Sequence, residues 1–440
     1  MSGEARQINS FEPVLTAGVT GTVMDGWTES LEEYRSKGGY EGLKRGLEIG
    51  PDQVLEEVKA ANIRGRGGAG FPAGTKWSFM PRDRKEPHYI AVNADESEPG
   101  TFSNRPILEQ RPHLLLEGAL LAAYATLSEA IYIYIRMEYY ESHRQVARAI
   151  AEAREAGLVG RNIMDSDFSC EIYIHPGAGA YICGEETAML ESLEGRRGYP
   201  RLRPPFPAVY GLFKKPTAVN NVETLAIVAE VIRRGVDWYR SIGTEKSPGM
   251  TVYSISGHVE RPGNYELPLG VTMRQLLYDH AGGIRNGNRL KAVFPGGSSV
   301  PVLFEDELDC VMDFDGPDRY GTYLGSTGII VMDETVCQVW AALNLMHFYE
   351  EESCGQCTPC REGTNWLHKI LTRLESGHGV PGDVELLEDI CKHIAGRSIC
   401  ALGEFATGCL VKTIPRYREE FQAHIEQRKC PFEKGYMEFK

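Results

Sequence analysis

The sequence has neither a long apolar run nor an excess of positive charge. Its longest apolar stretch, residues 118–127, is far shorter than the roughly 20 residues that a membrane-spanning helix needs. A formal net charge of -14 argues against nucleic acid or an anionic membrane surface as a direct partner. No internal repeat or low-complexity tract is present. These absences leave an ordinary globular chain, whose 440 residues predict roughly three domains.

Signs of export are also lacking. Residues 1–10 are polar and contain no apolar core of a signal peptide. The 11 cysteines are an odd number, which fits a reducing compartment better than a disulfide framework. Any membrane association is therefore expected to come through partner proteins.

The most informative feature that is present is a cluster of cysteines near the C-terminus. Cys354, Cys357 and Cys360 are separated by two residues each, and Cys400 lies in a loop further on. Zinc sites usually use two separated C-x-x-C pairs, so three cysteines in a row with a distant fourth favour a [4Fe–4S] cluster. Structural zinc remains the alternative from spacing alone. Buried core cysteines are disfavoured, because the flanking Gly, Gln, Thr and Pro form a turn.

A glycine-rich loop follows an amphipathic helix that the pattern predicts from Pro51. Residues 65–70 match G-x-G-x-x-G, but the dinucleotide fingerprint needs a strand before it, and here a helix precedes it. The loop still suits an anion, since glycine amides approach phosphate closely and Arg64, Arg66 and Lys76 supply positive charge. Nearby aromatic rings, Phe71, Trp77 and Phe79, are candidate stacking faces for a planar ligand. A flexible surface loop is the alternative.

Polar residues follow two predicted strands. The strand at residues 88–92 leads into Asn93–Gly100, which carries three carboxylates in four residues, Asp95, Glu96 and Glu98. The strand at 171–175 leads into a glycine-rich turn and a helix over 185–193. In α/β folds ligands gather at the carboxyl ends of strands, so both turns are candidate ligand sites. An exposed acidic turn is the competing interpretation for the first.

The middle of the chain changes character twice. Residues 195–218 are proline-rich and basic without an acidic residue, which suits a phosphorylated aromatic ligand or a plain surface crossover. Asn220–Glu223 predicts a helix cap. From about residue 246 short strands are expected at 251–256, 265–267, 290–294, 300–303 and 329–332, with a capping box at Thr272. From residue 334 the pattern is helical.

Together these motifs resemble one family closely. Residues 64–71, 93–102, 177–187, 200–207, 220–224 and 352–363 are similar to the NADH-oxidising, FMN-binding F subunit of bacterial respiratory NADH:quinone oxidoreductase, complex I. The resemblance covers residues 38–421. It implies an α/β flavin domain with an N-terminal arm (1–245), a β-grasp-like soluble-ligand-binding α+β module (246–333) and a C-terminal helical bundle carrying a [4Fe–4S] cluster (334–440).

The resemblance also implies a set of site residues. Glu96, Glu98 and Tyr181 would act at the catalytic centre, and Glu98 with Glu186 would hold NADH. The cluster ligands would be Cys354, Cys357, Cys360 and Cys400. The residues that would bind FMN or the nucleotide are Gly65, Arg66, Gly67, Gly68, Phe71, Lys76, Phe79, Asn93, Asp95, Glu96, Tyr181, Gly184, Glu185, Glu186, Arg203, Phe206, Val219, Asn220, Asn221 and Thr224.

What the resemblance implies for function is NADH oxidation coupled to single-electron transfer towards quinone. The implied partners are a thioredoxin-like [2Fe–2S] subunit and a larger iron–sulfur subunit, in the peripheral arm of a complex on the cytoplasmic side of the bacterial inner membrane. No nucleic acid and no direct membrane insertion are expected. A flavin subunit of a soluble NAD-linked hydrogenase or formate dehydrogenase, or a zinc-binding scaffold, would be the alternatives. Departures from the family pattern at Ser103, Asn104 and Arg203 concern the fine tuning of the nucleotide pocket, and the departure at Met137 concerns strand packing.

Overall fold

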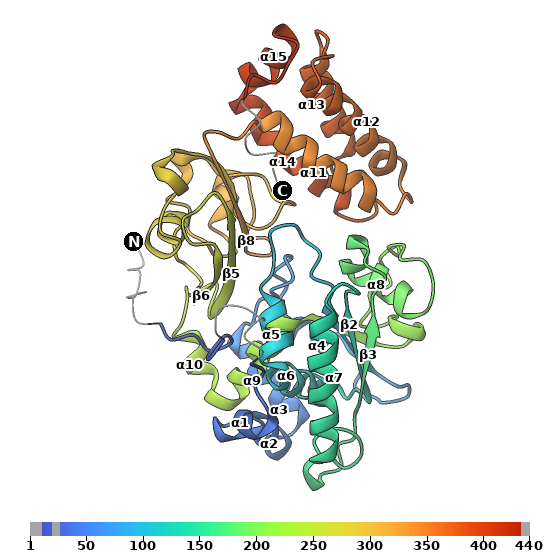
Figure 1. Cartoon of the computed structure of the whole chain (residues 1–440). Helices are drawn as coiled ribbons and strands as arrows, with labels where there is room; N and C mark the ends of the chain where they lie inside the picture. Colours follow the sequence, from blue (N-terminus) through green and yellow to red (C-terminus); the bar gives the residue numbers. More distant parts are fainter. Residues whose placement is uncertain (1–10, 20–26, 433–440) are drawn as a thin grey trace. The chain divides into compact units, whose positions relative to one another are not determined.

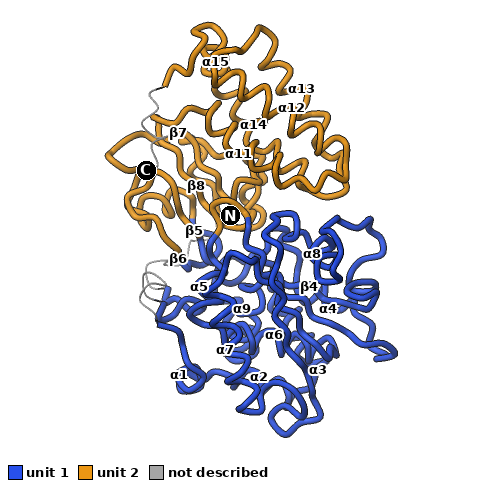
Figure 2. Tube along the Cα trace, turned by 45° about the vertical axis from the view of Figure 1, so that its right-hand side comes forward, with its two compact units in different colours: residues 1–97, 102–253, 266–271 blue, residues 98–101, 254–265, 272–440 orange. Residues whose placement is uncertain are grey.

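The computed structural model describes residues 11–19 and 27–432. The expectation that residues 1–10 contain no export signal concerns residues outside these ranges. The chain divides into two units, which Figure 2 draws in blue and orange. The first consists of Met1–Ser97, Phe102–Tyr253 and Glu266–Val271, and the second of Glu98–Thr101, Ser254–Tyr265 and Thr272–Lys440. Within the described ranges, no helix has the length and hydropathy that a bilayer crossing requires.

The first unit is built on a parallel sheet with strand order β3-β2-β1-β4 (Figure 1). Its strands are β1 (Tyr89–Ala94), β2 (Ala130–Ile135), β3 (Glu171–Pro176) and β4 (Thr217–Asn221). The register pairs Asn93 with both Tyr134 and Asn221. All four carboxyl ends therefore lie along one edge, where the predicted ligand turns begin. The strands expected at 88–92 and 171–175 are confirmed.

Two apolar helices of this unit contribute a large share of its core. All but one residue of α6 (Pro112–Thr126) are buried, and residues 222–232 of α9 (Val222–Arg234) are buried as well. Such all-round burial is typical of helices packed between a sheet and further helices. The remaining helices are α1 (Leu31–Ser36), α2 (Glu41–Ile49), α3 (Pro51–Ala61), α4 (Ala73–Ser78), α5 (Asn104–Gln110), α7 (Tyr140–Glu155), α8 (Glu186–Leu193) and α10 (Val236–Arg240).

Local signals in the sequence set several helix starts. The predicted cap before α9 is present, because the Asn221 side chain accepts hydrogen bonds from the amides of Glu223 and Thr224. The helix expected from Pro51 is confirmed as α3. Helices α1 and α2 are separate, because Tyr40 adopts a left-handed conformation between them.

A second sheet, of order β6-β5-β8-β7, lies mostly in the second unit, whereas the first residues of β5 and the last of β6 are assigned to the first. The strands are β5 (Met250–Gly257), β6 (Gly263–Pro268), β7 (Leu290–Phe294) and β8 (Gly328–Asp333). The capping box at Thr272 is present, since its side chain and amide exchange hydrogen bonds with Gln275 at the start of the short π-helix η6 (Gln275–His280). The strand expected at 300–303 is wrong: only an isolated bridge joins Leu303 to Val293, because no neighbouring strand in the described part of the chain continues the ladder.

A helical bundle completes the second unit. Its helices are α11 (Gln338–Glu352), α12 (Thr358–Glu375), α13 (Asp383–Ile394), α14 (Leu402–Arg416) and α15 (Arg418–Glu426). Cys391 and Cys409 are buried in its core. The bundle is joined to the sheet by a largely buried ion pair, in which Lys291 Nζ lies 2.7 Å from Glu420 Oε2.

Candidate functional site at the carboxyl edge of the parallel sheet

The turn after β1 is joined to the turn after β3 at the edge of the sheet. Asn93 Nδ2 donates to the carbonyl of Gly184 at 2.8 Å, and Asn93 Oδ1 accepts from the amide of Asp95 at 3.1 Å. Asp95 Oδ1 in turn accepts from Ser97 Oγ at 2.7 Å. Gly184 packs so close that an added Cβ would lie 3.5 Å from the Asp95 carbonyl. Three of the predicted ligand residues are thus brought together.

The glycine-rich loop after α3 forms a closed hairpin. The Gly65 amide donates to the Phe71 carbonyl at 3.0 Å, and Ala73 donates to Ile63 at 2.8 Å. Gly68 (φ 103°) and Gly70 (φ 63°) are left-handed, a conformation that glycine adopts without steric cost. Gly67 remains exposed next to Asn221, whose Cβ would lie 3.4 Å from a Cβ at Gly67. The loop therefore presents backbone to the same edge of the sheet.

Arg66 does not supply the charge that the sequence suggested. Its guanidinium donates to the Met250 carbonyl at 2.8 Å and lies 3.9 Å from the Glu223 carboxylate, with both side chains 2% exposed. Its amide donates to Thr224 Oγ1 at 2.9 Å. Burial raises the pKa of Glu223 to about 7, an effect that the Arg66 charge opposes. Arg66 and Thr224 thus fix the loop from behind, and the expectation that the Arg66 charge faces an anion is corrected.

Lys76 is the cation that faces the site. From α4 its Nζ reaches the Val219 carbonyl at 3.2 Å and Glu186 Oε2 at 3.3 Å. Glu186 also pairs with Arg203 Nη1 at 2.8 Å. Lys76, Glu186 and Arg203 are each only partly exposed, so this charged chain joins three predicted ligand segments in one place.

Glu96 is buried, and its carboxylate is already engaged. It accepts from the amides of Asn104 at 2.8 Å and Arg105 at 3.1 Å, and from Tyr139 Oη at 3.1 Å. Ser103 Oγ contributes a longer contact of 3.4 Å. Burial raises the pKa of Glu96 against the pull of these donors. The carboxylate therefore caps the N-terminus of α5, and the departures Ser103 and Asn104 lie directly against it.

The other two predicted carboxylates also have protein partners. Glu185 Oε2 caps α8 by accepting from the amides of Thr187 and Ala188, both at 2.9 Å. Glu98 belongs to the second unit, where its Oε1 accepts from the Ser299 amide at 2.8 Å and from Ser298 Oγ at 3.2 Å. The loop at residues 295–299 thus holds Glu98, a role that its sequence did not indicate.

Exposed aromatic rings flank the glycine-rich loop. Phe71 is 46% exposed and Phe79 is 56% exposed, and their ring centroids lie 6.3 Å apart. Phe206 is 57% exposed in the basic, proline-rich segment. The prediction that Trp77 is a stacking face is wrong. Trp77 is fully buried, and its Nε1 donates to Asn220 Oδ1 at 2.9 Å. Tyr181 lies half-buried in the turn after β3.

Candidate cluster ligands lie at one end of the α11–α12 helix pair. Cys357 is the N-cap of α12, and Cys360 is buried in its first turn with Sγ 3.3 Å from Ser353 Oγ at the end of α11. The amide of Ile399 donates to Cys357 Sγ at 3.3 Å, which brings the loop of Cys400 against the triple. Burial raises the pKa of the Cys360 thiol, and the nearby thiols of Cys354 and Cys357 add to the rise. A helix N-terminus and a donating amide favour thiolates here.

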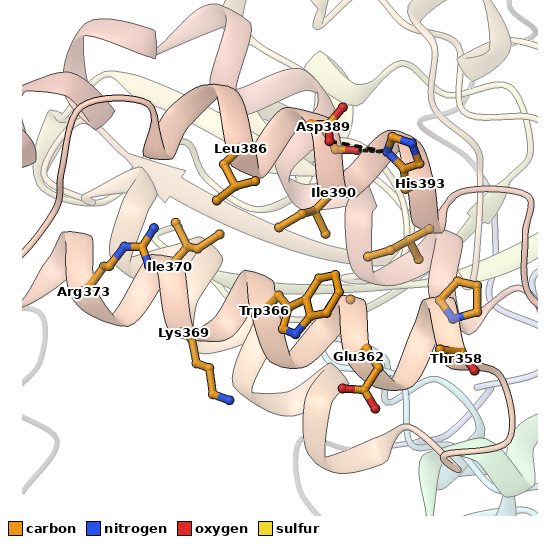
Figure 3. Close-up of a pocket in the computed structure, with 13 residues that line it drawn as sticks. Thr358, Glu362, Trp366, Lys369, Ile370, Arg373, Leu386, Asp389, Ile390 and His393 are labelled. Carbon is orange, nitrogen blue, oxygen red and sulfur yellow. Dashed lines mark hydrogen bonds and ion pairs between the residues drawn. The ribbon is translucent and has the colours of Figure 1, made fainter.

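A shallow apolar groove of about 590 Å³ runs from the first turn of α12 along its face towards α13. Figure 3 shows Trp366 and Ile370 on one side and Leu386 and Ile390 on the other. Trp366 is 53% exposed and Leu386 is 42% exposed. The groove begins at Thr358, directly after Cys357. Its apolar walls leave a substantial hydrophobic surface beside the cysteines.

Comparison with known proteins identifies the family of the chain. Three family models match: a Nuo51 FMN-binding domain over residues 58–230, an SLBB domain over 252–303 and a NADH-ubiquinone oxidoreductase-F iron-sulfur binding region over 340–424. The NADH-quinone oxidoreductase F subunit 2 of Rhizobium meliloti (strain 1021) is 52% identical over 423 residues, 96% of this chain and 100% of that protein. The chain belongs to the F-subunit family of NADH-quinone oxidoreductase. The F subunit of the Mycobacterium tuberculosis (strain ATCC 25618 / H37Rv) enzyme is 51% identical over 93% of both chains.

A solved structure shows the same fold in another assembly. A chain of an NAD⁺-reducing [NiFe]-hydrogenase in the air-oxidized state matches with a TM-score of 0.77 and 34% identity over 85% of this chain. The match spans 63% of that hydrogenase chain. The predicted fold class is confirmed: an α/β FMN-binding domain, an SLBB module and a helical iron–sulfur region. Membership also establishes the enzyme class, the cofactors FMN and [4Fe–4S], and NADH as substrate.

The residues present fit both cofactors. A flavin phosphate needs exposed amides and a cation, which Gly67, the left-handed Gly68 and Lys76 offer at one edge of the sheet. Thiols at Cys354, Cys357 and Cys360, with the Cys400 loop bonded to Cys357, form a donor set of the kind that holds a [4Fe–4S] cluster. The sequence did not indicate three residues that hold Glu96 and Arg66 at the flavin site, because no local motif marks them. They are Tyr139, which bonds Glu96, and Tyr239 and Met250, which bond Arg66.

Proposed function

We propose that this chain oxidises NADH at an FMN held on the carboxyl edge of the parallel sheet. It then delivers the electrons, through a cluster on Cys354, Cys357, Cys360 and Cys400, to partner subunits and towards quinone. The observation that carries the proposal is the convergence of separate loops at that edge, through the bonds of Asn93 to Gly184 and of Lys76 to Val219. FMN, when bound, accepts electron pairs from NADH and releases electrons singly.

The proposed roles follow from where the side chains lie. Lys76 would neutralise a phosphate, and Gly67 and Gly68 would meet it through their backbone amides. Gly65 and Arg66, whose amides donate to Phe71 and Thr224, would hold the loop in shape around it. The exposed rings of Phe71 and Phe79 would stack on the nucleotide's adenine, with Phe206 beside them. The other proposed contacts are Asn93, Asp95, Glu96, Glu98, Tyr181, Gly184, Glu185, Glu186, Arg203, Val219, Asn220, Asn221 and Thr224.

The chain's own residues would orient the reacting groups and exclude water. Hydride transfer needs stacked rings at short range and no general acid, so positioning is the main task of the protein. Glu96 and Glu185 would act through the helices that they cap, α5 and α8, which support the turns around the site. The carboxylates of Asp95, Glu96 and Glu98 would disfavour additional negative charge on the ligand.

Partner subunits are part of the proposal. We infer that a larger iron–sulfur subunit covers the groove between α12 and α13, because this apolar surface starts beside the cluster cysteines. A thioredoxin-like [2Fe–2S] subunit would be the second neighbour. The complex would lie on the cytoplasmic side of the bacterial inner membrane. The division into domains at 1–245, 246–333 and 334–440 stays a prediction.

The test uses the full chain prepared without oxygen. The wild type should show flavin absorbance, bound iron and NADH-to-ferricyanide activity. Cys357→Ser should abolish the electron paramagnetic resonance signal of the reduced cluster while retaining part of the ferricyanide activity, because the flavin site is built on other elements. Cys391→Ser, in the bundle core, is the matched control that should keep the signal. A colourless wild type without dye reductase activity would end the proposal.

A second candidate is a flavin subunit of a soluble NAD-linked hydrogenase, which the fold likeness to the NAD⁺-reducing enzyme favours. Isolation of the native assembly separates the two. Co-purification with quinone-reducing membrane subunits supports the respiratory role, and co-purification with a [NiFe] subunit supports the hydrogenase role.

A further inference from the structure

A second cluster of metal-binding side chains lies in the bundle, apart from the cysteines described above. Cys337, Glu375, His424 and Cys430 each present one ligand atom, and these atoms all lie within 4.8 Å of one another. Cys337 is the N-cap of α11, Glu375 ends α12, His424 is in α15 and Cys430 follows it. Four separate positions in the chain thus converge on one point.

The contacts within the cluster are close. Cys337 Sγ lies 3.3 Å from His424 Nε2 and 3.8 Å from Glu375 Oε2. His424 Nε2 lies 3.3 Å from the same Glu375 oxygen. Cys337 and His424 are fully buried, Glu375 is 8% exposed, and Cys430 is half-buried.

The tautomer of His424 is fixed by a bond on its far side. Nδ1 lies 2.8 Å from the carbonyl oxygen of Glu420, which can only accept, so Nδ1 carries the hydrogen. In the neutral ring, Nε2 then directs a lone pair at the Glu375 carboxylate and the Cys337 sulfur. Two acceptors at 3.3 Å repel each other unless a positive charge lies between them. Metal-ligating histidines characteristically make this type of second bond to a carbonyl.

We propose that Cys337, Glu375, His424 and Cys430 bind a structural Zn²⁺ ion. Two thiolates, one imidazole nitrogen and one carboxylate oxygen form a closed set of four donors of the types that zinc takes in tetrahedral sites. Binding releases the two thiol protons, so the ion would be surrounded by two thiolates and one carboxylate, which leaves the centre with a single net negative charge.

The position of the site gives it a structural role. Helix α11 has 15 residues, so Cys337 at its start is about 22 Å from the cysteine triple at its other end. The ion would join the open ends of the α11–α12 pair to α15 and to the segment after it. The pair would then be held at both ends, by the cluster at one and by zinc at the other.

Zinc K-edge X-ray absorption of the anaerobically purified full chain tests the site without interference from iron. The expected result is about one zinc per chain with two sulfur neighbours near 2.3 Å and two nitrogen or oxygen neighbours near 2.0 Å. Cys430→Ser and Glu375→Gln should each lower the zinc content at least about tenfold while iron and flavin contents stay at wild-type values. Cys310→Ser, at a buried cysteine elsewhere in the unit, is the control that should keep its zinc.

Three results would overturn the proposal. If the wild-type protein contains no zinc, the cluster is instead a buried imidazolium–carboxylate pair of His424 and Glu375. A shell of four sulfur atoms would place adventitious zinc on the cluster cysteines. A protein mass lower by two hydrogens, mapped to a Cys337–Cys430 peptide, would show a disulfide.

Discussion

Replacing Glu96 by glutamine tests whether this carboxylate is a helix cap or a direct flavin ligand. A glutamine keeps one carbonyl oxygen for the Asn104 amide, but its NH₂ group then faces the amide of Arg105, and two donors cannot bond. Tyr139 can rotate its hydroxyl to accept instead, so that contact survives. An unsatisfied buried amide costs about 1–3 kcal/mol. Loss of the negative charge at the start of α5 adds about 0.3–1 kcal/mol.

The total, about 1.3–4 kcal/mol, should appear in the free energy of unfolding of the first unit. For a domain of this size it corresponds to a fall in Tm of about 3–16 °C. Thermal unfolding of Glu96→Gln is measured with and without bound flavin, alongside Glu155→Gln, an exposed carboxylate at the end of α7. If Glu96 is a cap, flavin-free and flavin-loaded proteins should lose similar stability, and the control should lose almost none.

The contrary result would refute the assignment of Glu96 as a helix cap. An unchanged Tm of the flavin-free protein, combined with a tenfold or larger loss of flavin affinity, would show that the carboxylate acts on the ligand. A redox titration completes the comparison. Removing this negative charge should raise the flavin potential, and a potential equal to that of wild type would limit Glu96 to holding α5.

Three further changes probe other parts of the molecule. Lys76→Met should weaken FMN binding at least about tenfold, because it removes the cation that contacts the Val219 carbonyl at the edge of the sheet; fluorescence titration of the flavin measures it. Burial raises the pKa of Glu117 to about 7, above its unfolded value of about 4.3, so its contribution to stability is full at low pH and is lost as pH rises through 7. The free energy of urea unfolding of the first unit should fall by up to about 3 kcal/mol from pH 4 to 8, and Glu117→Gln should flatten that slope. Trp366→Glu should reduce co-purification of the larger iron–sulfur partner at least about tenfold with ferricyanide activity intact, whereas Lys392→Glu on α13 should not.

Much of the fold was predictable from local patterns. The strand at residues 171–175 and the cap at Asn221 are where the sequence places them, because both signals depend on neighbours a few residues away. The strand expected at 300–303 is absent, because its formation depends on a partner that is not a neighbour in sequence. Its apolar residues suit a strand, but a ladder also needs a partner in register, and within the described ranges only Val293 meets Leu303.

The candidate site was predictable in its location more than in the roles of its residues. The carboxyl ends of the strands identify the edge, since parallel pairing brings them together. Whether a charged side chain faces a ligand or the protein depends on distant groups. Arg66 is neutralised by Glu223 and held by Met250, neither of which is near it in sequence. The same holds for the proposed zinc ligands, because Cys337 and Cys430 lie almost a hundred positions apart.

The pairing of β1 with β4 has a consequence for how the protein folds. The strands that meet across this ladder, Tyr89–Ala94 and Thr217–Asn221, are separated by almost half of the first unit, so much of that chain must be ordered before the ladder closes. Non-local parallel pairing is intrinsically slow, whereas helices that pack against their neighbours in sequence, as α11 to α14 do, form rapidly. The helical bundle is therefore equipped to fold before the parallel sheet closes, and the flavin half sets the pace of maturation.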